Sequence, residues 1–380
     1  MKGVRLAATL LAGTVAGLMT MVLTSGRAVA AGEETLRTEI LRSGTRNDLL
    51  AVSFNGPRTG HAVGAHGTIL ATTDGGRSWA PRPNPVTGTL NDLFTGVSFA
   101  DAGRGYAVAA NGSMVTSVDG GSTWALVTTT SPPPASLRAL SFTDTRTGYA
   151  VGGNGVIIAT ADGGRTWAQQ GRPEFGPLHD VSAPDASHAY AAGPAGPSGG
   201  LIFAAVATND AGRTWRPRTS KLGANFYGVW FADASNGHVV GEEGQILATR
   251  DGGRRWKVQR GGTKEIIFGV SFFDAHRGVA VGADHARTDA QRGKVLYTSD
   301  GGQTWLSKSV GTSRLLWGIR FADAKTAYAV GAGGTIVRLT FAPSQAGEES
   351  GREISPVLLV VLLMVTVAVG ILVRVRRGGK

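Results

Sequence analysis

A turn of the form Asp-(Gly/Ala)-Gly-x-(Ser/Thr/Arg)-Trp occurs six times in this chain of 380 residues. Its aspartates are Asp74, Asp119, Asp162, Asp210, Asp251 and Asp300. Successive copies are 45, 43, 48, 41 and 49 residues apart, and the sequence between them is rich in β-branched runs and glycine turns. A repeat of this length and composition predicts one four-stranded propeller blade rather than a helical solenoid unit. The chain is therefore expected to be an all-β propeller.

Seven short strand-like segments open the repeats, so we expect seven blades. These segments end at Phe54, Phe99, Phe142, Ala183, Phe231, Phe272 and Phe321. The last repeat, Leu315 to about Phe341, lacks a fourth strand, whereas Glu39–Gly44 near the N-terminus resembles one. We predict that this N-terminal strand completes blade seven and closes the ring, which removes sheet edges that favour aggregation.

The N-terminal 30 residues have the order of a secretory signal peptide. Lys2 and Arg5 precede an apolar stretch, and small residues follow up to Ala30. Cleavage after Ala30 is expected, but the apolar stretch is long, so an uncleaved anchor remains an alternative.

The C-terminal end predicts a membrane anchor. An uncharged apolar run of 17 residues, Val357 to Val373, is about the minimum for a spanning helix, which we place at 356–373. The tail 374–380 is basic, and positive charge beside a span stays cytoplasmic. The polar stretch 342–355 is interpreted as a linker. The propeller, residues 35–341, is thus predicted to lie outside the cytoplasmic membrane of a single-pass protein, in a periplasm or at the cell surface.

Composition excludes several classes of site. The chain has no cysteine, which rules out disulfides, a thiol nucleophile and thiolate metal sites. The formal net charge is +11, but seven basic residues lie in the predicted signal and tail, which leaves +4 for the exported part. No helix-based reading motif accompanies this charge, so we expect no nucleic-acid partner.

The motifs resemble a known family. The Ser/Thr-x-Asp-Gly-Gly-x-Thr-Trp turn is similar to the Asp-box, or BNR repeat, of sialidase-type propellers. The seven-fold Phe-x-Asp…Gly-Tyr-Ala-Val-Gly pattern over residues 35–341 resembles the photosystem II assembly and stability factors of cyanobacteria and chloroplasts. The resemblance implies a seven-bladed propeller that meets a partner protein through an arginine-rich patch. The chain differs from the cyanobacterial pattern because it has no lipobox cysteine and carries a C-terminal span.

The repeated polar residues are interpreted as structural. An aspartate in such a turn bonds its own backbone, and the copies lie about one blade apart, too far to form a catalytic carboxylate pair. Tyr106, Tyr149, Tyr190 and Tyr328 share one position of the second strand, so they are assigned to the core. Only Tyr227 is free for a sialidase-type role, and no acid and arginine set is assigned around it. The seven histidines are scattered, so no metal site and no cofactor are expected.

The informative position is the second residue of each innermost strand, because its residue type differs from blade to blade. We call this set the variable ring: Leu50, Thr95, Arg138, His179, Tyr227, Phe268 and Trp317. The preceding residue is apolar in every blade. Strand alternation places the variable ring on the face opposite the Asp-box turns. That face also carries two long loops, at Gly193–Gly200 and Ala283–Lys294.

Basic residues are expected on the same face, in the connections from a fourth strand to the next first strand. They are Arg172, Arg216, Arg218, Lys221, Arg260, Lys264, Lys308 and Arg314. Arg172, Arg216 and Arg218 are the residues to which the resemblance assigns the arginine-rich patch.

These observations favour a non-catalytic, protein-binding assembly scaffold. Its partner is expected to be a membrane protein or an acidic segment. The predicted contact residues are Arg138, Arg172, His179, Arg216, Arg218, Tyr227, Phe268 and Trp317. The alternative is a carbohydrate-binding or sialidase-like propeller, because aromatic side chains around a central pocket also suit sugars. A third hypothesis is a surface protein whose propeller serves only as a spacer or a shield.

Overall fold

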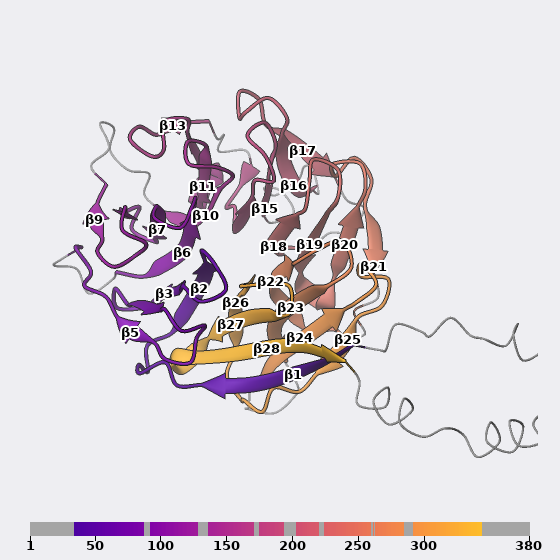
Figure 1. Cartoon of the computed structure of the whole chain (residues 1–380). Coiled ribbons are helices and arrows are strands. Elements are labelled where there is room, and N and C mark those ends of the chain that lie inside the picture. Colours follow the sequence, from indigo (N-terminus) through magenta and orange to yellow (C-terminus); the bar gives the residue numbers. More distant parts are fainter. Residues whose placement is uncertain are drawn as a thin grey trace, which may run out of the picture. The chain divides into compact units, whose positions relative to one another are not determined.

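Seven antiparallel sheets of four strands form the part of the chain that the computed structural model describes, residues 34–86, 92–127, 136–170, 175–193, 203–219, 224–259, 261, 263–284 and 292–343. The sheets are arranged as blades around a common axis (Figure 1). Each blade packs on the next, and the innermost strand of the seventh blade contacts that of the first. The predicted all-β, seven-bladed propeller is confirmed.

Blades one to six run from the axis outward in chain order, and blade seven takes its outermost strand from the N-terminal end of the described residues. The innermost strands are β2 (Leu49–Phe54), β6 (Phe94–Phe99), β10 (Leu137–Phe142), β14 (Asp180–Ser182), β18 (Phe226–Phe231), β22 (Ile266–Phe272) and β26 (Leu316–Phe321). The second strands are β3 (Gly60–Gly64), β7 (Gly105–Ala109), β11 (Gly148–Gly152), β15 (Ala189–Ala192), β19 (Gly237–Gly241), β23 (Gly278–Asp284) and β27 (Thr326–Gly331).

The outer half of each blade is completed by a third and a fourth strand. The third strands are β4 (Ile69–Thr72), β8 (Met114–Ser117), β12 (Ile157–Thr160), β16 (Phe203–Thr208), β20 (Ile246–Thr249), β24 (Arg292–Thr298) and β28 (Thr335–Pro343). The outermost strands are β5 (Ala80–Pro81), β9 (Ala125–Leu126), β13 (Ala168–Gln169), β17 (Arg216–Thr219), β21 (Lys257–Gln259), β25 (Leu306–Lys308) and β1 (Glu34–Leu41). Single turns of 3₁₀-helix connect second to third strands at η1 (Gly153–Gly155), η3 (Glu242–Gly244) and η4 (Ala332–Gly334).

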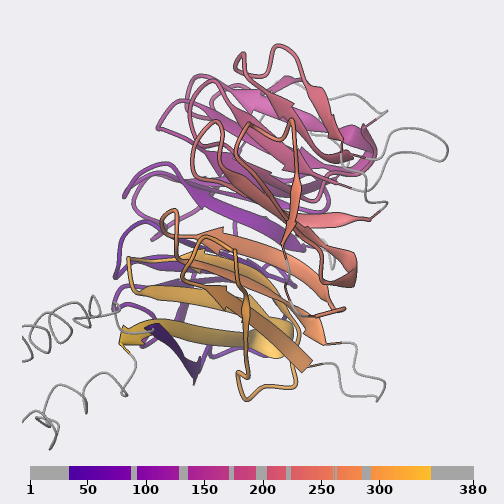
Figure 2. The same ribbon diagram turned by 90° about the vertical axis from the view of Figure 1, so that its right-hand side faces the viewer.

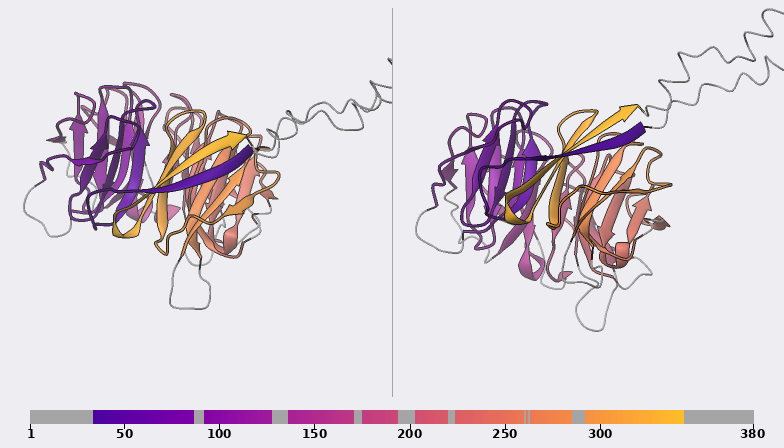
Figure 3. Two further views of the ribbon diagram at one scale, coloured as in Figure 1. Left: turned by 60° about the horizontal axis from the view of Figure 1, so that its bottom comes forward. Right: turned by 90° about the horizontal axis from the view of Figure 1, so that it is seen from below.

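The ring is closed by the N-terminal strand. The seventh sheet has the order β1-β28-β27-β26, so β1 supplies the strand that the last repeat lacks. Figure 3 shows β1 in indigo beside β28 in yellow, two segments from opposite ends of the sequence. An ion pair between Arg338 on β28 and Glu39 on β1 adds to this pairing. The predicted closure of blade seven is confirmed.

Aromatic stacking joins five of the seven pairs of neighbouring blades in the described part of the chain, and Figure 2 shows the blades in a view turned by 90° from that of Figure 1. In each of these five pairs, a tyrosine or histidine ring of a second strand stacks on the phenylalanine that ends the next blade's innermost strand. Tyr106 stacks on Phe142 with ring centroids 4.4 Å apart, and Tyr328 stacks on Phe54 at 4.4 Å. The Tyr328 hydroxyl also donates to the carbonyl of Gly75, 2.5 Å away, in the Asp-box of blade one. The tyrosines of this position are therefore core residues, as predicted.

The predicted ends of the protein fall almost entirely outside the described residues. No helix in the described ranges is long and apolar enough to cross a membrane. The signal 1–30, the span 356–373 and the tail 374–380 lie outside these ranges, and the linker 342–355 is described only at Ala342 and Pro343, which belong to β28.

Candidate functional site

A β-bulge turns the variable ring toward the axis. In six blades the pairing of the innermost strand with the second strand skips one residue, as between Leu49 and Ala51, where Leu50 is the extra residue. The same irregularity recurs at Thr95, Arg138, Tyr227, Phe268 and Trp317. In blade four His179 immediately precedes β14. A bulge re-aims one side chain without changing the rest of the strand, and bulges are common beside functional sites.

A glycine at the end of the second strand makes room for this bulge. A Cβ on Gly152 would lie 2.0 Å from the carbonyl oxygen of Ser136, and one on Gly241 would lie 2.1 Å from that of Asn225. Both distances are too short for real atoms, so a side chain there would displace the chain that leads into the innermost strand. The final glycine of the Gly-Tyr-Ala-Val-Gly pattern therefore has a steric role.

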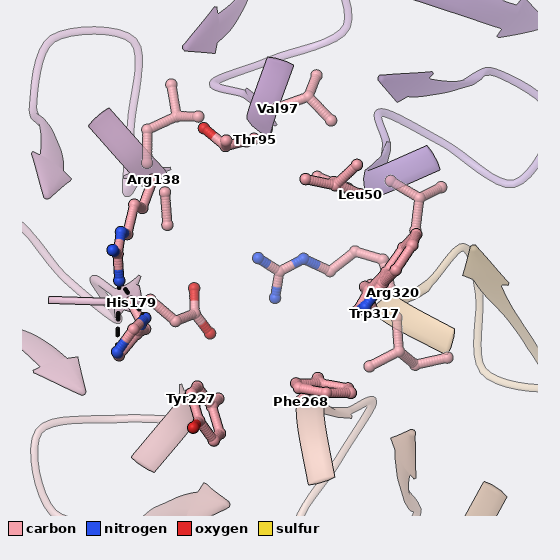
Figure 4. A pocket seen from close by; sticks show the side chains of 18 of the residues that line it. Leu50, Thr95, Val97, Arg138, His179, Tyr227, Phe268, Trp317 and Arg320 are labelled. Carbon is pink, nitrogen blue, oxygen red and sulfur yellow. Dashed lines mark hydrogen bonds between the residues drawn. The ribbon is translucent and has the colours of Figure 1, made fainter. Parts of the chain in front are cut away.

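The variable ring surrounds one central pocket of about 130 Å³ (Figure 4). Figure 4 shows Arg138 and His179 on one side of this pocket and Phe268 and Trp317 on the other, with Tyr227 between them. All seven members of the ring line it, as do Asp180 and Arg320. The structure therefore brings together five of the predicted contact residues. The pocket has a polar side and an aromatic side.

Arg138 and His179 form the polar side. The Arg138 guanidinium lies 2.5 Å from Nδ1 of His179. Since a guanidinium only donates, this nitrogen must accept, which fixes the neutral imidazole with its proton on Nε2. Burial, together with the Arg138 charge, lowers the pKa of His179 to about 4, in agreement with a neutral ring at physiological pH. The positive charge of Arg138 is thus not balanced by its nearest partner.

Tyr227 connects the pocket to a carboxylate on η3. Its hydroxyl donates to Oε1 of Glu242 at 3.0 Å, and the side-chain amide of Asn225 donates to the same oxygen at 2.8 Å. Burial and the Glu242 contact raise the pKa of Tyr227. The bonds from Asn225 are the main cause of the lowered pKa of Glu242. The phenol is therefore held protonated and the carboxylate ionised.

Asp180, on β14, and Arg320, on β26, both line the pocket. Both carboxylate oxygens of Asp180 accept from backbone: Oδ1 from Val181 at 2.8 Å and Oδ2 from Val229 of the next blade at 2.9 Å. Burial raises the pKa of Asp180, and the Arg320 charge opposes that shift. Figure 4 shows the Arg320 side chain extending into the middle of the pocket. Within the described residues, neither Arg138 nor Arg320 forms an ion pair with a carboxylate.

Arg216 and Arg218 lie elsewhere, so their predicted position is wrong. They belong to the outermost strand β17 instead of the connection that follows it. Arg218 packs on the Asp-box of blade five, because a Cβ on Gly253 would lie 3.1 Å from its Cγ. Gln170 and Gln259 contact Gly212 and Gly302 in the same way. The neighbouring blade thus fixes this position, and a binding role for the two arginines stays a prediction.

The other basic residues of the predicted face differ in how their observed positions agree with the prediction. Lys308 lies in strand β25 rather than in a connection, whereas Lys264 and Arg314 lie in connections as predicted. Arg172, Lys221 and Arg260 fall outside the described residues. The loop predicted at Ala283–Lys294 is partly an extended hairpin, because β23 continues to Asp284 and β24 begins at Arg292.

The Asp-box aspartates form one repeated hydrogen-bond pattern, which agrees with their structural assignment. In blade three, Asp162 accepts from the hydroxyl of Thr160 at 2.8 Å, the amide of Thr166 at 2.9 Å and the hydroxyl of Thr166 at 2.6 Å. The bonds from Thr166 are the main cause of a pKa lowered to about 2. The carboxylate oxygens are thus satisfied within the turn. No group of three metal-ligating side chains occurs in the described part of the chain.

Three residues of the site were missed by the sequence analysis. Asp180 stands where the other six blades have glycine or alanine, and Arg320 stands where five blades have serine. Comparison of these two strand positions across the repeats, as for the variable ring, would have identified both. Glu242 lies in a turn whose sequence differs between blades, so no repeat-based signal marks it.

Comparisons with known proteins support the predicted resemblance. The family model described as "Photosynthesis system II assembly factor YCF48" matches residues 33–135. No curated protein sequence matches the chain. The predicted resemblance to this family is confirmed, over a part of the chain in sequence and over the propeller in fold.

Solved structures with the same fold include two of this family. One is described as YCF48 bound to D1 peptide, with a TM-score of 0.65, 20% identity, and coverage of 80% of this chain and 96% of that one. YCF48 from Cyanidioschyzon merolae gives a TM-score of 0.66 and 20% identity, with coverage of 80% and 98%. A GH74 xyloglucanase from Xanthomonas campestris gives 0.61 at 15% identity, covering 79% of this chain and 53% of that one. At these identities the likeness establishes the fold.

Proposed function

We propose that this chain is a non-catalytic binding propeller that holds a segment of a partner protein on the face carrying the variable ring. The observation that carries the proposal is the set of six bulges, which direct Arg138, Tyr227, Phe268 and Trp317 to one pocket with His179. Aromatic and arginine side chains are the types most enriched at the energetic centres of protein interfaces. A similar propeller, the YCF48 structure, is described as bound to a peptide.

The proposal includes a membrane location. A signal at 1–30 and a span at 356–373 would hold the propeller outside the cytoplasmic membrane, near a membrane-protein partner. Because the chain has no cysteine, single cysteines give a clean test. Ser313→Cys, in an exposed loop, should react with an impermeant maleimide on intact cells or spheroplasts. Gly379→Cys should react only after permeabilisation, and the reverse pattern would contradict the topology.

Affinity capture tests the binding face. The tagged full-length chain, solubilised with its membranes in mild detergent, is expected to retain one defined set of proteins. Tyr227→Ala with Trp317→Ala should abolish that retention, because both side chains line the pocket. Arg165→Glu, on an exposed Asp-box turn, is the matched control and should retain the same set. Retention by the pocket variant would refute the proposed face.

The arginine-rich patch is tested in the same assay. Arg172, Arg216 and Arg218 changed together to glutamate should abolish capture if the partner also contacts this patch. Both Arg216 and Arg218 belong to β17, and Arg218 lies beside the Asp-box of the next blade. Loss with the triple variant but not with the pocket variant would therefore move the interface to that side of the ring.

A sialidase-like activity is the second candidate, favoured by one observation. Tyr227 is hydrogen-bonded to Glu242, and the two cations Arg138 and Arg320 line the same pocket as Tyr227. The pKa shifts oppose it, since the phenol is stabilised in its protonated form and the carboxylate in its weakly basic form. Release of a fluorophore from a sialoside by the wild-type chain, and its loss in Tyr227→Phe, would establish this candidate over the binding role.

A further inference from the structure

We infer that the central pocket binds a carboxylate group attached to a small apolar or aromatic body. The inference rests on the proposed function in one respect, namely that the pocket is a recognition site. It adds the chemical class of the group that enters. Three features of the pocket carry it: its two guanidinium groups, its aromatic side and its volume.

The two guanidinium groups provide the charge. Arg138 donates one hydrogen bond to neutral His179, and within the described residues Arg320 forms no ion pair. A guanidinium presents five N–H donors, so both groups keep donors for a ligand. Of the lining residues, only Asp180 carries an opposing carboxylate, and both of its oxygens already accept backbone bonds. Glu242 does not line the pocket, and Asn225 and Tyr227 already donate to it. An entering carboxylate would therefore find two cations whose donors are only partly used.

The aromatic side provides an apolar contact for the rest of the ligand. Phe268 and Trp317 lie across the pocket from Arg138 and His179 (Figure 4). Tyr227 lies between the two sides, with its ring centroid 5.0 Å from that of His179 and 5.6 Å from that of Phe268. A ligand with charge at one end and an apolar body at the other would match both sides at once.

The volume limits what can enter. A cavity of about 150 Å³ binds benzene in a well-studied engineered protein, and this pocket has about 130 Å³. One ring or a short aliphatic chain with its carboxylate matches this volume. An acidic side chain or chain end of a protein, and a free small acid, share this chemistry.

Calorimetric titration of the full-length chain in detergent tests the inference with matched probes. Benzoate and benzamide have nearly the same shape, but only benzoate is charged. We expect benzoate to bind at least about tenfold more tightly, because a guanidinium donates stronger hydrogen bonds to an ionised carboxylate than to a neutral amide. Arg138→Gln and Arg320→Gln should each weaken benzoate binding about tenfold. Arg165→Gln, on the Asp-box side, should leave it unchanged.

The outcomes separate the sources of the ligand. A capped peptide with one glutamate between alanines, if bound with the same arginine dependence, identifies a protein side chain as the source. Binding of benzoate without the peptide identifies a free acid, whereas preference for N-acetylneuraminate, whose body is polar, would contradict the apolar part of the inference. Equal binding of benzoate and benzamide, or no binding of any of these acids, would overturn the inference. If a glutamine variant does not fold, the benzoate-to-benzamide ratio and Arg138→Lys, which keeps the charge, still decide it.

These titrations need no partner protein, so they are independent of the capture assay. Capture that depends on the pocket, without carboxylate binding, would refute the inference and keep the proposed function. Carboxylate binding without any captured partner would keep the inference and refute the proposed protein-binding function.

Discussion

The Asp-box turns and the variable ring occupy equivalent positions in successive blades, yet they behave in opposite ways. Each Asp-box repeats the same bonds, as Asp74, Asp162 and Asp300 show, and its carboxylate is satisfied within its own turn. The variable ring has a different residue in every blade, and its shared feature is a backbone bulge. In a repeat protein, chemistry that recurs in every unit serves the fold. Chemistry that occurs once is available for recognition.

The largest expected difference is in the free energy of unfolding. It separates variants of the residues that join neighbouring blades from variants of the residues that line the pocket. Tyr328→Ala removes the ring that stacks on Phe54 and the bond to Gly75, which close blade seven against blade one. Truncation of a buried aromatic side chain costs about 3–5 kcal/mol. Trp317→Ala, in the partly buried ring around the pocket, should cost less, about 1 kcal/mol. Denaturant unfolding of both variants measures this difference, and equal losses would remove the distinction.

The next effect is acid sensitivity of the blade contacts. His61 and His238 stack on Phe99 and Phe272, and burial is the main cause of a pKa lowered to about 4 in both. The folded state favours the neutral ring, so its stabilisation is complete above pH 6.5 and is lost as the pH falls toward 4. Each ring should lose on the order of 3 kcal/mol over that range.

His61→Tyr tests the acid sensitivity, because tyrosine occupies the same position in blades two, three, four and seven. The variant should fold and lose less stability between pH 6.5 and 4.5 than the wild-type chain in the same denaturant series. An unchanged pH slope would show that His61 does not cause the effect.

The smallest effect is expected for a single Asp-box. Asp162→Ala removes three accepted hydrogen bonds in an exposed turn, while Gly164 still donates to the Thr160 hydroxyl. We expect a loss of about 1 kcal/mol in unfolding free energy and no change in capture of the partner. Loss of capture in a folded Asp162→Ala chain would assign recognition to the Asp-box side.

The fold could be predicted from the sequence because each blade repeats the same local rules. Period, turn chemistry and the missing fourth strand were sufficient for blade number and closure. The variable ring was also found, since it is where the repeat varies. Asp180 and Arg320 also differ from the residues at the same positions of the other blades. These are the third and fifth positions of the innermost strand, which were not considered as sites of contact residues.

The contacts between strands and turns were harder to predict from the sequence than the fold. Arg216 and Arg218 were placed in a connection because sequence spacing does not show where a fourth strand ends, a boundary that pairing with β16 decides. The Tyr227–Glu242 bond joins a strand to a turn 15 residues away, and only the fold brings them together.

Site-specific photo-cross-linking tests most directly whether recognition lies at the variable ring. A photoreactive phenylalanine analogue is placed at Leu50, which lines the pocket but is not a proposed contact residue, and separately at Arg165 on the Asp-box side. We predict that the captured partner is cross-linked from position 50 and not from position 165. Cross-linking from position 165 alone would contradict the assignment of function to the variable ring.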